Sequence, residues 1–382
     1  MAKKTVKRIK TEGDFWLLIL TLLLCVFGLL MVYSASYYHS ISKYGDPTHF
    51  MINHGIYMLV GWAAFIFLSG FDYHRFRKWT PLILLVGVLL LIVVLIYGIT
   101  LNNAQRWIQI GPVSIMPGEV IKTCMIFGLA FYFSLQKENV STLKGLLPVF
   151  AVSLLVFGLI CLQPNYSTAA VVLLIIVLIC FAAGLPWKFV FLAAAAFGGL
   201  IALALILKGG YVLDRIRIIF DPWSDALGDG YQVVQGLLAL GSGGVLGKGL
   251  GGSIQKALYL PEPENDYILA IIGEELGYVG LLILILVYLL LIWRIFRAAV
   301  RAADKYGMLI AAGVGIHISV HVILNIAIVS ATFFPTGIVL PFISYGGNAL
   351  ILFIAEAGLA YNVSRYPDEK YLSENRKTEE SR

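Results

Sequence analysis

The chain of 382 residues is 59% hydrophobic and only 13% charged, with a formal net charge of +6 at pH 7. Soluble domains have about 25% charged residues, so this composition excludes an ordinary water-soluble protein and indicates a polytopic membrane protein. All four cysteines lie inside apolar runs, where they behave as small hydrophobes and argue against a disulfide framework.

Ten apolar runs follow one another along the chain, each close to the roughly 20 residues that a helix needs to cross a hydrocarbon core. They lie near residues 15–34, 52–70, 80–99, 117–136, 145–162, 168–184, 188–207, 266–293, 308–331 and 346–364. The first run is too long for a signal-peptide core and is interpreted as a retained span. The sequence therefore predicts an all-α polytopic membrane protein with about ten transmembrane helices.

Lysine and arginine residues gather beside alternate ends of these runs. Five of them fall within residues 3–10, before the first run, and Arg75, Arg77 and Lys78 follow the second. The positive-inside rule then places both termini in the cytoplasm. Because this pattern is typical of membrane topology, it does not predict a nucleic-acid partner.

This topology divides the chain into a basic cytoplasmic tail (1–14), a membrane domain (15–365) and a polar cytoplasmic tail (366–382) that is predicted to be disordered. The predicted extracytoplasmic segments are 35–51, 100–116, the turn around Gln163-Pro164-Asn165, 208–265 and 332–345. The long segment 208–265 is expected to contain re-entrant or amphipathic pieces. Candidate chemistry therefore faces outward.

The loop 208–265 ends in the run Leu260–Asp266 (LPEPEND), which leads directly into an apolar helix. Asp266 thus places a single carboxylate where a polar loop meets the membrane. One interpretation is a helix N-cap, a position where aspartate stabilises the helix by about 1 kcal/mol. The other is a general base, and from the residues alone the two interpretations are equally supported.

Glu119 and Lys122 are three residues apart at the outer end of the fourth run, so they share one helix face and are expected to pair. A structural ion pair is one hypothesis. The other is that Lys122, together with Arg106 in the preceding loop, contacts a phosphate group. Arg106 is the better candidate because its guanidinium fork matches phosphate oxygens.

Glu274 and Glu275 lie eight and nine residues beyond Asp266, which in a straight helix is about 12 to 13 Å deeper. Structural pairing is favoured for them, with His317, His321 or Lys122 as partners. His317 and His321 have the spacing of a metal site, but the glutamate of a His-Glu-x-x-His motif is absent, so a zinc site is disfavoured.

Residues 241–252 are rich in glycine and match G-x-G-x-x-G, but no strand precedes them and no βαβ unit surrounds them. No nucleotide or organic cofactor is predicted. The glycines are interpreted as permitting close backbone approach in a buried or cavity-lining segment.

Several short motifs occur along the chain: Tyr33–Ser36, Arg106–Ile108, Pro117–Glu119 with Lys122, Gln163-Pro164, Gly230–Gln232, Gly241–Gly244, Gly247–Gly251, Leu260–Asp266, Gly273–Gly277 and Leu340–Gly347. Together they resemble the shape, elongation, division and sporulation (SEDS) family of polytopic glycosyltransferases, and its division and sporulation branch more than its elongation branch. The chain departs from the family pattern at Glu264-Asn265, Asn165, Gly118, His321 and Asn348.

The resemblance implies an inverting glycosyltransferase that polymerises lipid II at the outer face of a bacterial cytoplasmic membrane, with Asp266 needed for activity. It also implies a class B penicillin-binding transpeptidase as partner, further division or sporulation membrane proteins, and assistance by a divalent cation such as Mg²⁺ or Mn²⁺, whose ligands stay unknown. The candidate substrate-binding residues are Arg106, Glu119, Lys122, Arg215, Arg217, Lys248 and Ser344.

Other functions stay open. A flippase for lipid-linked oligosaccharide also fits ten spans with intramembrane charges, but it needs a polar path to the cytoplasmic face. A non-catalytic scaffold for a transpeptidase would tolerate the loss of Asp266. An elongation-type polymerase is a further alternative.

Overall fold

The computed structural model describes residues 10–101, 104–111, 113–136, 143–188, 199, 221–369 and 371. Apolar helices dominate this part of the chain because a helix satisfies its own backbone hydrogen bonds in a medium without water. The helices are α1 (Phe15–Tyr44), α2 (His49–Gly70), α3 (Tyr73–Tyr97), α4 (Pro117–Leu135), α5 (Leu143–Leu162), α6 (Tyr166–Ala182), α8 (Tyr231–Gly243), α9 (Ile268–Val300), α10 (Lys305–Val329) and α11 (Gly347–Ser364), with a 3-10 turn at Pro222–Asp225.

Nine of the ten predicted spans are helices in the described part of the chain, and seven of these are long and apolar enough to cross a membrane. The remaining predicted span, 188–207, lies almost wholly outside the described residues. The prediction of an all-α polytopic membrane protein is therefore confirmed. The predicted amphipathic piece of the long loop is α8, which buries Val233, Val234 and Ala239.

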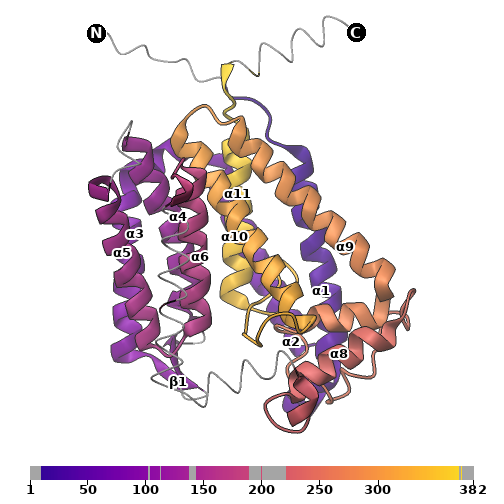
Figure 1. Cartoon of the computed structure of the whole chain (residues 1–382). Coiled ribbons are helices and arrows are strands. Elements are labelled where there is room, and N and C mark those ends of the chain that lie inside the picture. The colour runs from indigo at the N-terminus through magenta and orange to yellow at the C-terminus, as the bar shows by residue number, and fades with distance from the viewer. Residues whose placement is uncertain are drawn as a thin grey trace, which may run out of the picture.

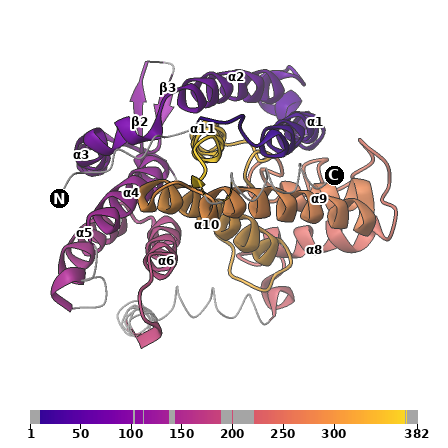
Figure 2. The same cartoon turned by 90° about the horizontal axis from the view of Figure 1, so that it is seen from above.

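Helix α10 forms the centre of the bundle. Figure 2 shows it between α11 on one side and α6 on the other, with α4 and α9 near its ends. Of its most apolar stretch, 78% is buried, compared with 17% for α2. Small residues allow close helix crossings, as at Gly358 of α11, where an added Cβ would lie 2.8 Å from the backbone of Phe65 in α2. Polar side chains on α10 are consequently shielded from lipid.

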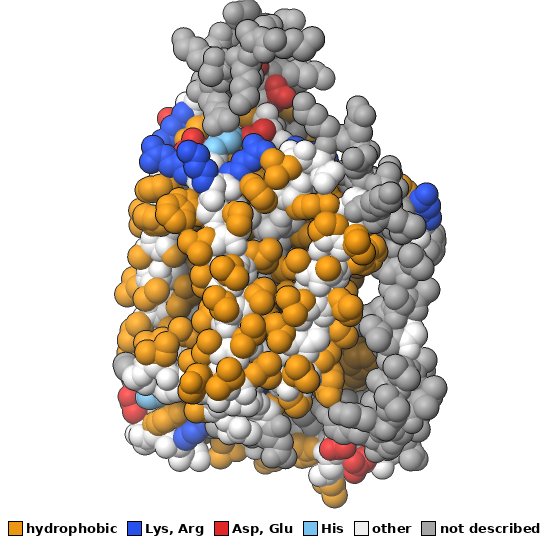
Figure 3. Space-filling model, turned by 90° about the vertical axis from the view of Figure 1, so that its left-hand side faces the viewer, with side chains coloured by type: hydrophobic (Ala, Val, Ile, Leu, Met, Phe, Trp, Pro, Cys, Tyr) orange, Lys and Arg blue, Asp and Glu red, His pale blue; other side chains and the backbone are white. Residues whose placement is uncertain are grey.

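One end of the molecule carries the first and last described residues (Figure 1). The N–H of Thr11 donates to the carbonyl of Arg365 at 2.9 Å, and Arg294 of α9 pairs with Asp14 before α1 at 2.6 Å. On the face over α3 and α5, Figure 3 shows a broad apolar band below an edge where lysine and arginine side chains gather at this same end. Both termini thus leave from one edge of the apolar band.

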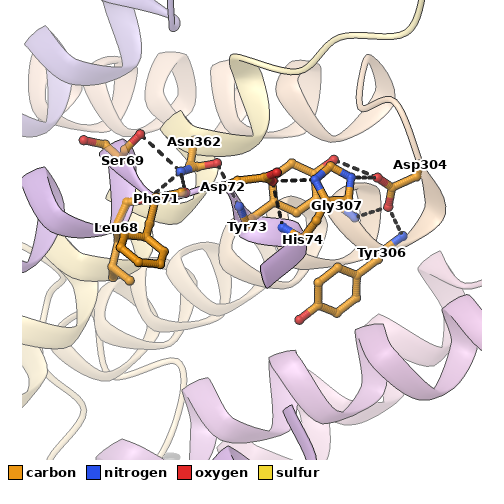
Figure 4. Close-up of polar contacts among 10 residues, drawn as sticks. All are labelled: Leu68, Ser69, Phe71, Asp72, Tyr73, His74, Asp304, Tyr306, Gly307 and Asn362. Atoms are coloured by element: carbon orange, nitrogen blue, oxygen red, sulfur yellow. Dashed lines mark hydrogen bonds and ion pairs between the residues drawn. The ribbon is translucent and has the colours of Figure 1, made fainter. Parts of the chain in front are cut away.

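Hydrogen bonds and ion pairs between polar side chains at the ends of α3, α10 and α11 hold this end of the molecule together (Figure 4). The Asn362 amide of α11 donates to the carbonyls of Leu68 at 2.6 Å and Ser69 at 3.1 Å, where α2 ends. His74 of α3 bridges two carboxylates, Asp72 at 2.6 Å and Asp304 at the start of α10. Burial alone would raise the pKa of Asp304, but hydrogen bonds from His74, the Gly307 N–H and Tyr73 outweigh it and lower the pKa to about 2.

The C-terminal boundary lies later than the sequence predicted. The predicted disordered tail begins at Tyr366, but the backbone of residues 366–368 pairs with the turn between α9 and α10. The N–H of Asp368 donates to the carbonyl of Arg301 at 2.9 Å, and Pro367 forms a β-bridge with Ala302. The burial of Tyr366 explains the difference, since one aromatic side chain suffices to hold a short segment.

The opposite end holds the connecting segments that were predicted to be extracytoplasmic. Three short strands form a small antiparallel sheet, β1 (Ile99–Leu101), β2 (Ala104–Ile110) and β3 (Val113–Ile115). The prediction of a loop over residues 35–51 is wrong for most of this range, because α1 continues to Tyr44. The helix ends there because the next residue, Gly45, has a φ of 71°. This extension brings α1 side chains up to the loop before α9.

Candidate active site

Asp266 lies in the loop before α9 and is held through its backbone. Helix α9 begins at Ile268, and its cap position is Tyr267, which makes no side-chain cap hydrogen bond. Asp266 is therefore not the N-cap. The Asn325 amide of α10 donates to the carbonyl of Asp266 at 2.8 Å and to that of Ile338 at 2.8 Å, so one buried side chain joins the loop before α9 to the segment before α11.

The Asp266 carboxyl is partly buried and sits in a negative field. Burial raises its pKa to about 7, and the charges of Glu262 and Glu264 add to the effect. No lysine, arginine or histidine of the described residues forms an ion pair with it. A carboxyl of this kind exchanges protons near neutral pH, which suits a general base.

Glu264 connects three segments at this site. Its carboxylate is 1% exposed and accepts from Nδ1 of His39, on the extended end of α1, at 2.7 Å. Its carbonyl accepts from the Tyr345 N–H at 2.8 Å. The loop before α9 is thus fixed by α1, α10 and the segment before α11, none of which is near it in the sequence.

Glu119 and Lys122 pair as the sequence predicted, with Lys122 Nζ 2.7 Å from Glu119 Oε1. Lys122 Nζ also donates to Nε2 of His321 at 3.0 Å, while Nδ1 of His321 donates to the carbonyl of Val339 at 3.2 Å. The two hydrogen bonds define the neutral tautomer of His321. Because Lys122 is 2% exposed, the structure supports the ion pair rather than a direct phosphate contact.

Helix α10 carries a stripe of polar residues formed by His317, His321 and Asn325, four residues apart and therefore on one face. His317 Nδ1 donates to Glu356 of α11 at 2.8 Å. Sequence reasoning noticed the histidine spacing but missed Asn325 and Glu356. The signal was present, since a polar residue every fourth position on an otherwise apolar helix marks the face that packs on polar partners.

Glu274 and Glu275 do not lie deeper along a straight helix. Helix α9 is broken at Gly277 (φ 67°, ψ −169°), and the short piece before the break runs in a different direction from the rest (Figure 1). The expected structural pairing is confirmed, but its predicted partners are wrong. Lys248 binds Glu274 at 2.6 Å and Lys256 binds Glu275 at 2.7 Å.

The glycine-rich segment packs its backbone against the break in α9. The N–H groups of Lys248 and Gly249 donate to the carbonyls of Glu274 and Glu275 at 3.0 and 2.9 Å. A Cβ at Gly247 (φ 78°) would lie 2.2 Å from the carbonyl oxygen of Glu275. The prediction that these glycines permit close backbone approach is therefore confirmed.

The other predicted substrate contacts differ in position. Arg106, on β2, donates from Nη2 to the carbonyl of Pro164 in the α5–α6 turn at 2.5 Å. Lys248 is 28% exposed and its charge is balanced by Glu274. Ser344 is 3% exposed and its hydroxyl accepts from the Leu340 N–H, so it holds a turn instead of facing a ligand. Arg215 and Arg217 lie outside the described residues.

The described residues do not by themselves build a cation site. No group of three or more His, Cys, Asp or Glu side chains among them could hold a metal ion. Both ring nitrogens of His321 are hydrogen-bonded, to Lys122 and to the carbonyl of Val339, and Nδ1 of His317 is bound to Glu356. No step of the reaction is accordingly routed through a metal.

The fold and the site together define a polytopic membrane protein in which a partly buried carboxyl, that of Asp266, lies in the loop before a broken helix. Residues 15–369 match the model of the cell cycle protein family of FtsW, RodA and SpoVE, and the chain belongs to this family. The predicted resemblance to SEDS proteins is thereby confirmed.

Two relatives and one solved structure illustrate the likeness. The chain is 38% identical to stage V sporulation protein E of Bacillus subtilis, over 94% of this chain and 98% of that protein. It is 37% identical to the probable peptidoglycan glycosyltransferase FtsW of Coxiella burnetii, over 95% and 99%. It matches a chain from a structure on the coordination of polymerization and crosslinking by a peptidoglycan synthase complex, with a TM-score of 0.78 and 26% identity over 92% and 98%.

Proposed function

We propose that this protein is a peptidoglycan glycosyltransferase of the division and sporulation branch, which polymerises lipid II into glycan strands. The observation that carries the proposal is Asp266, a partly buried carboxyl without a cationic partner among the described residues, with a pKa of about 7. The naming of relatives as peptidoglycan glycosyltransferases supports it.

In the proposed reaction, the 4-hydroxyl of one sugar displaces undecaprenyl diphosphate from the anomeric carbon of another. Asp266 accepts the hydroxyl proton as the new C–O bond forms and the bond to the diphosphate oxygen breaks. Direct displacement with one carboxylate base inverts the anomeric centre. Positioned proton transfer of this kind contributes about 100-fold to 10,000-fold in rate.

The leaving diphosphate requires positive charge. Lys122 and Lys248 are held by Glu119 and Glu274, so their charges are already balanced. Arg106 is partly buried on β2, and its guanidinium fork suits two phosphate oxygens. Arg106 is therefore proposed as the contact for the diphosphate because of the geometry of its fork.

The flippase alternative needs a wet polar path through the bundle. Four ionisable side chains between the described helices instead bind one another and are nearly fully buried, with Lys122 and His321 at 2%, His317 at 1% and Glu356 at 0% exposed. Such pairs stabilise helix packing and do not line an open passage. The polymerase is favoured over the flippase for this reason.

The test is incubation of the purified full-length protein with fluorescently labelled lipid II, alone and together with a class B penicillin-binding transpeptidase, which we propose as its partner. We expect glycan strands in gel electrophoresis, with more product when the transpeptidase is present. Transfer of lipid II between leaflets of a vesicle without any polymer would instead support a flippase.

We further propose that the end carrying Asp266 faces the outside of a bacterial cytoplasmic membrane and that both termini are cytoplasmic. Leu227, 93% exposed, lies in the segment before α8, and the exposed Glu369 lies at the opposite end. In intact cells, an impermeant thiol reagent is expected to label Leu227→Cys and to label Glu369→Cys only after permeabilisation.

The parental protein is the control for this labelling, because three of its cysteines are buried and Cys161 is partly buried. The reverse pattern would place the Asp266 end in the cytoplasm and would exclude polymerisation at the outer face.

A further inference from the structure

The pair of partly buried His39 and buried Glu264 has no assigned role in the proposed reaction. Glu264 Oε1 binds His39 at 2.7 Å, but Glu264 Oε2 is buried without a hydrogen-bond partner among the described residues. A buried carboxylate oxygen without a hydrogen-bond partner destabilises the fold. A fold retains such a group more readily when its charge serves the neighbouring site.

Three carboxyls, at Glu262, Glu264 and Asp266, occupy five consecutive positions, and they differ in surroundings. Glu262 is exposed, while Glu264 is almost completely buried. Burial raises the pKa of Glu264 and the neighbouring Glu262 adds to this, whereas His39 lowers it. His39 is the one basic side chain that pairs with this group in the described part of the chain.

The groups that face the pair come from every element around it. His39 is on α1, its ring packs on Phe50 of α2 with centroids 5.3 Å apart, and the Tyr345 phenol belongs to the segment before α11. Glu262 and Asp266 share the loop with Glu264. Asn325 of α10 is neutral and binds the loop backbone. A change of charge at Glu264 consequently acts on Asp266, and His39 acts on Asp266 through Glu264.

We propose that His39 and Glu264 act as a positioning pair that fixes the loop carrying Asp266 and sets the negative field in which Asp266 accepts a proton. This inference rests on the proposed function, in which Asp266 is the base. Glu264 supplies the nearby negative charge that increases the proton affinity of Asp266. His39 anchors Glu264 to α1 and limits that charge, so that Asp266 still loses its proton near neutral pH.

Two substitutions separate charge from shape. Glu264→Gln keeps a side-chain oxygen for His39 but removes the negative charge, so the protonation midpoint of Asp266 is expected to fall by on the order of one pH unit. His39→Gln keeps a donor for Glu264 but removes the positive charge that the ring carries when protonated, so the midpoint is expected to rise. Opposite directions would not arise from general damage to the loop.

The midpoint is measured without any need for activity. The full-length protein in detergent is treated with N,N′-dicyclohexylcarbodiimide, which modifies protonated carboxyls in apolar surroundings, and Asp266 modification is followed by mass spectrometry between pH 5 and about 9, bracketing the raised pKa. The rate of lipid II polymerisation is measured over the same range. Asp229→Asn, at an exposed carboxylate before α8, is the control and is expected to titrate like the parental protein.

Shifts of opposite sign in carbodiimide modification, matched by the acid limb of the rate, would support the positioning pair. Parental midpoints in both variants would overturn it, even if the polymerase is active. The midpoints could also shift as expected while neither the parental protein nor any variant makes polymer. In that case the electrostatic role stands and the proposed function fails. Should Glu264→Gln not fold, His39→Gln alone decides through its upward shift.

Discussion

Replacing Asp266 by asparagine is expected to reduce lipid II polymerisation by about 100-fold to 10,000-fold, since it removes the base without changing the shape of the side chain. The fold should persist, because Asn325 binds the backbone carbonyl of Asp266 and α9 is not capped by its side chain. The measurement is the initial rate of polymer formation by purified protein, with the melting temperature as a check on folding.

The pH dependence of the parental enzyme follows from the same group. A base with a pKa of about 7 is protonated and inactive below that pH and ionised above it, so the rate should rise as the pH increases from 6 to 8. Asp229→Asn, at an exposed carboxylate before α8, is the control and should retain the parental rate and pH dependence. A parental rate in Asp266→Asn would show that Asp266 is not the base, and the scaffold alternative would then be preferred.

The largest loss of stability is expected from Lys256→Met. Glu275 is 0% exposed, and its carboxylate depends on Lys256 at 2.7 Å and the Ser34 hydroxyl at 2.7 Å, with Oε2 unpartnered among the described residues. Removing one member of a buried ion pair typically costs about 3 to 5 kcal/mol, since the other charge stays buried and uncompensated. We expect a clear fall in the melting temperature in detergent.

The neighbouring pair provides an internal control. Glu274 binds Lys248, but it also accepts from the hydroxyls of Ser242 and Ser253 and from two backbone N–H groups, of Ile254 and Gln255. Lys248→Met should therefore cost only about 1 kcal/mol. The double variant Lys256→Met with Glu275→Gln should recover much of the lost stability. Equal losses for the two lysine variants would contradict this ranking.

Much of the membrane architecture was predictable because lipid imposes a simple rule. A segment of about 20 apolar residues must be helical to satisfy its backbone, so the spans could be located from composition alone. The Glu119–Lys122 pair was predictable for a similar reason, since three residues along a helix fix the distance between the two side chains. The glycine-rich segment could be interpreted because glycine alone tolerates such close backbone approach.

The partners of the buried charges were not predictable in the same way. Lys248 and Lys256 reach Glu274 and Glu275 only because α9 breaks at Gly277. A glycine in an apolar run does not by itself predict such a break. Likewise, residues 35–51 were expected to form a loop after the first span. Helix α1 continues to Tyr44 because polar side chains in this stretch find partners, among them His39 on Glu264 and Ser40 on the carbonyl of Asp46.

By itself, the sequence determined the class of protein, the position of most spans and the choice of Asp266, because these depend on local composition and on motifs contiguous in the chain. Only the tertiary structure decided which groups surround Asp266: His39 of α1 through Glu264, Asn325 of α10, and the backbone of Tyr345. These contacts join residues that are far apart in the sequence. Burial and hydrogen bonding act through space, and so the proton affinity of the proposed base is a property of the folded bundle.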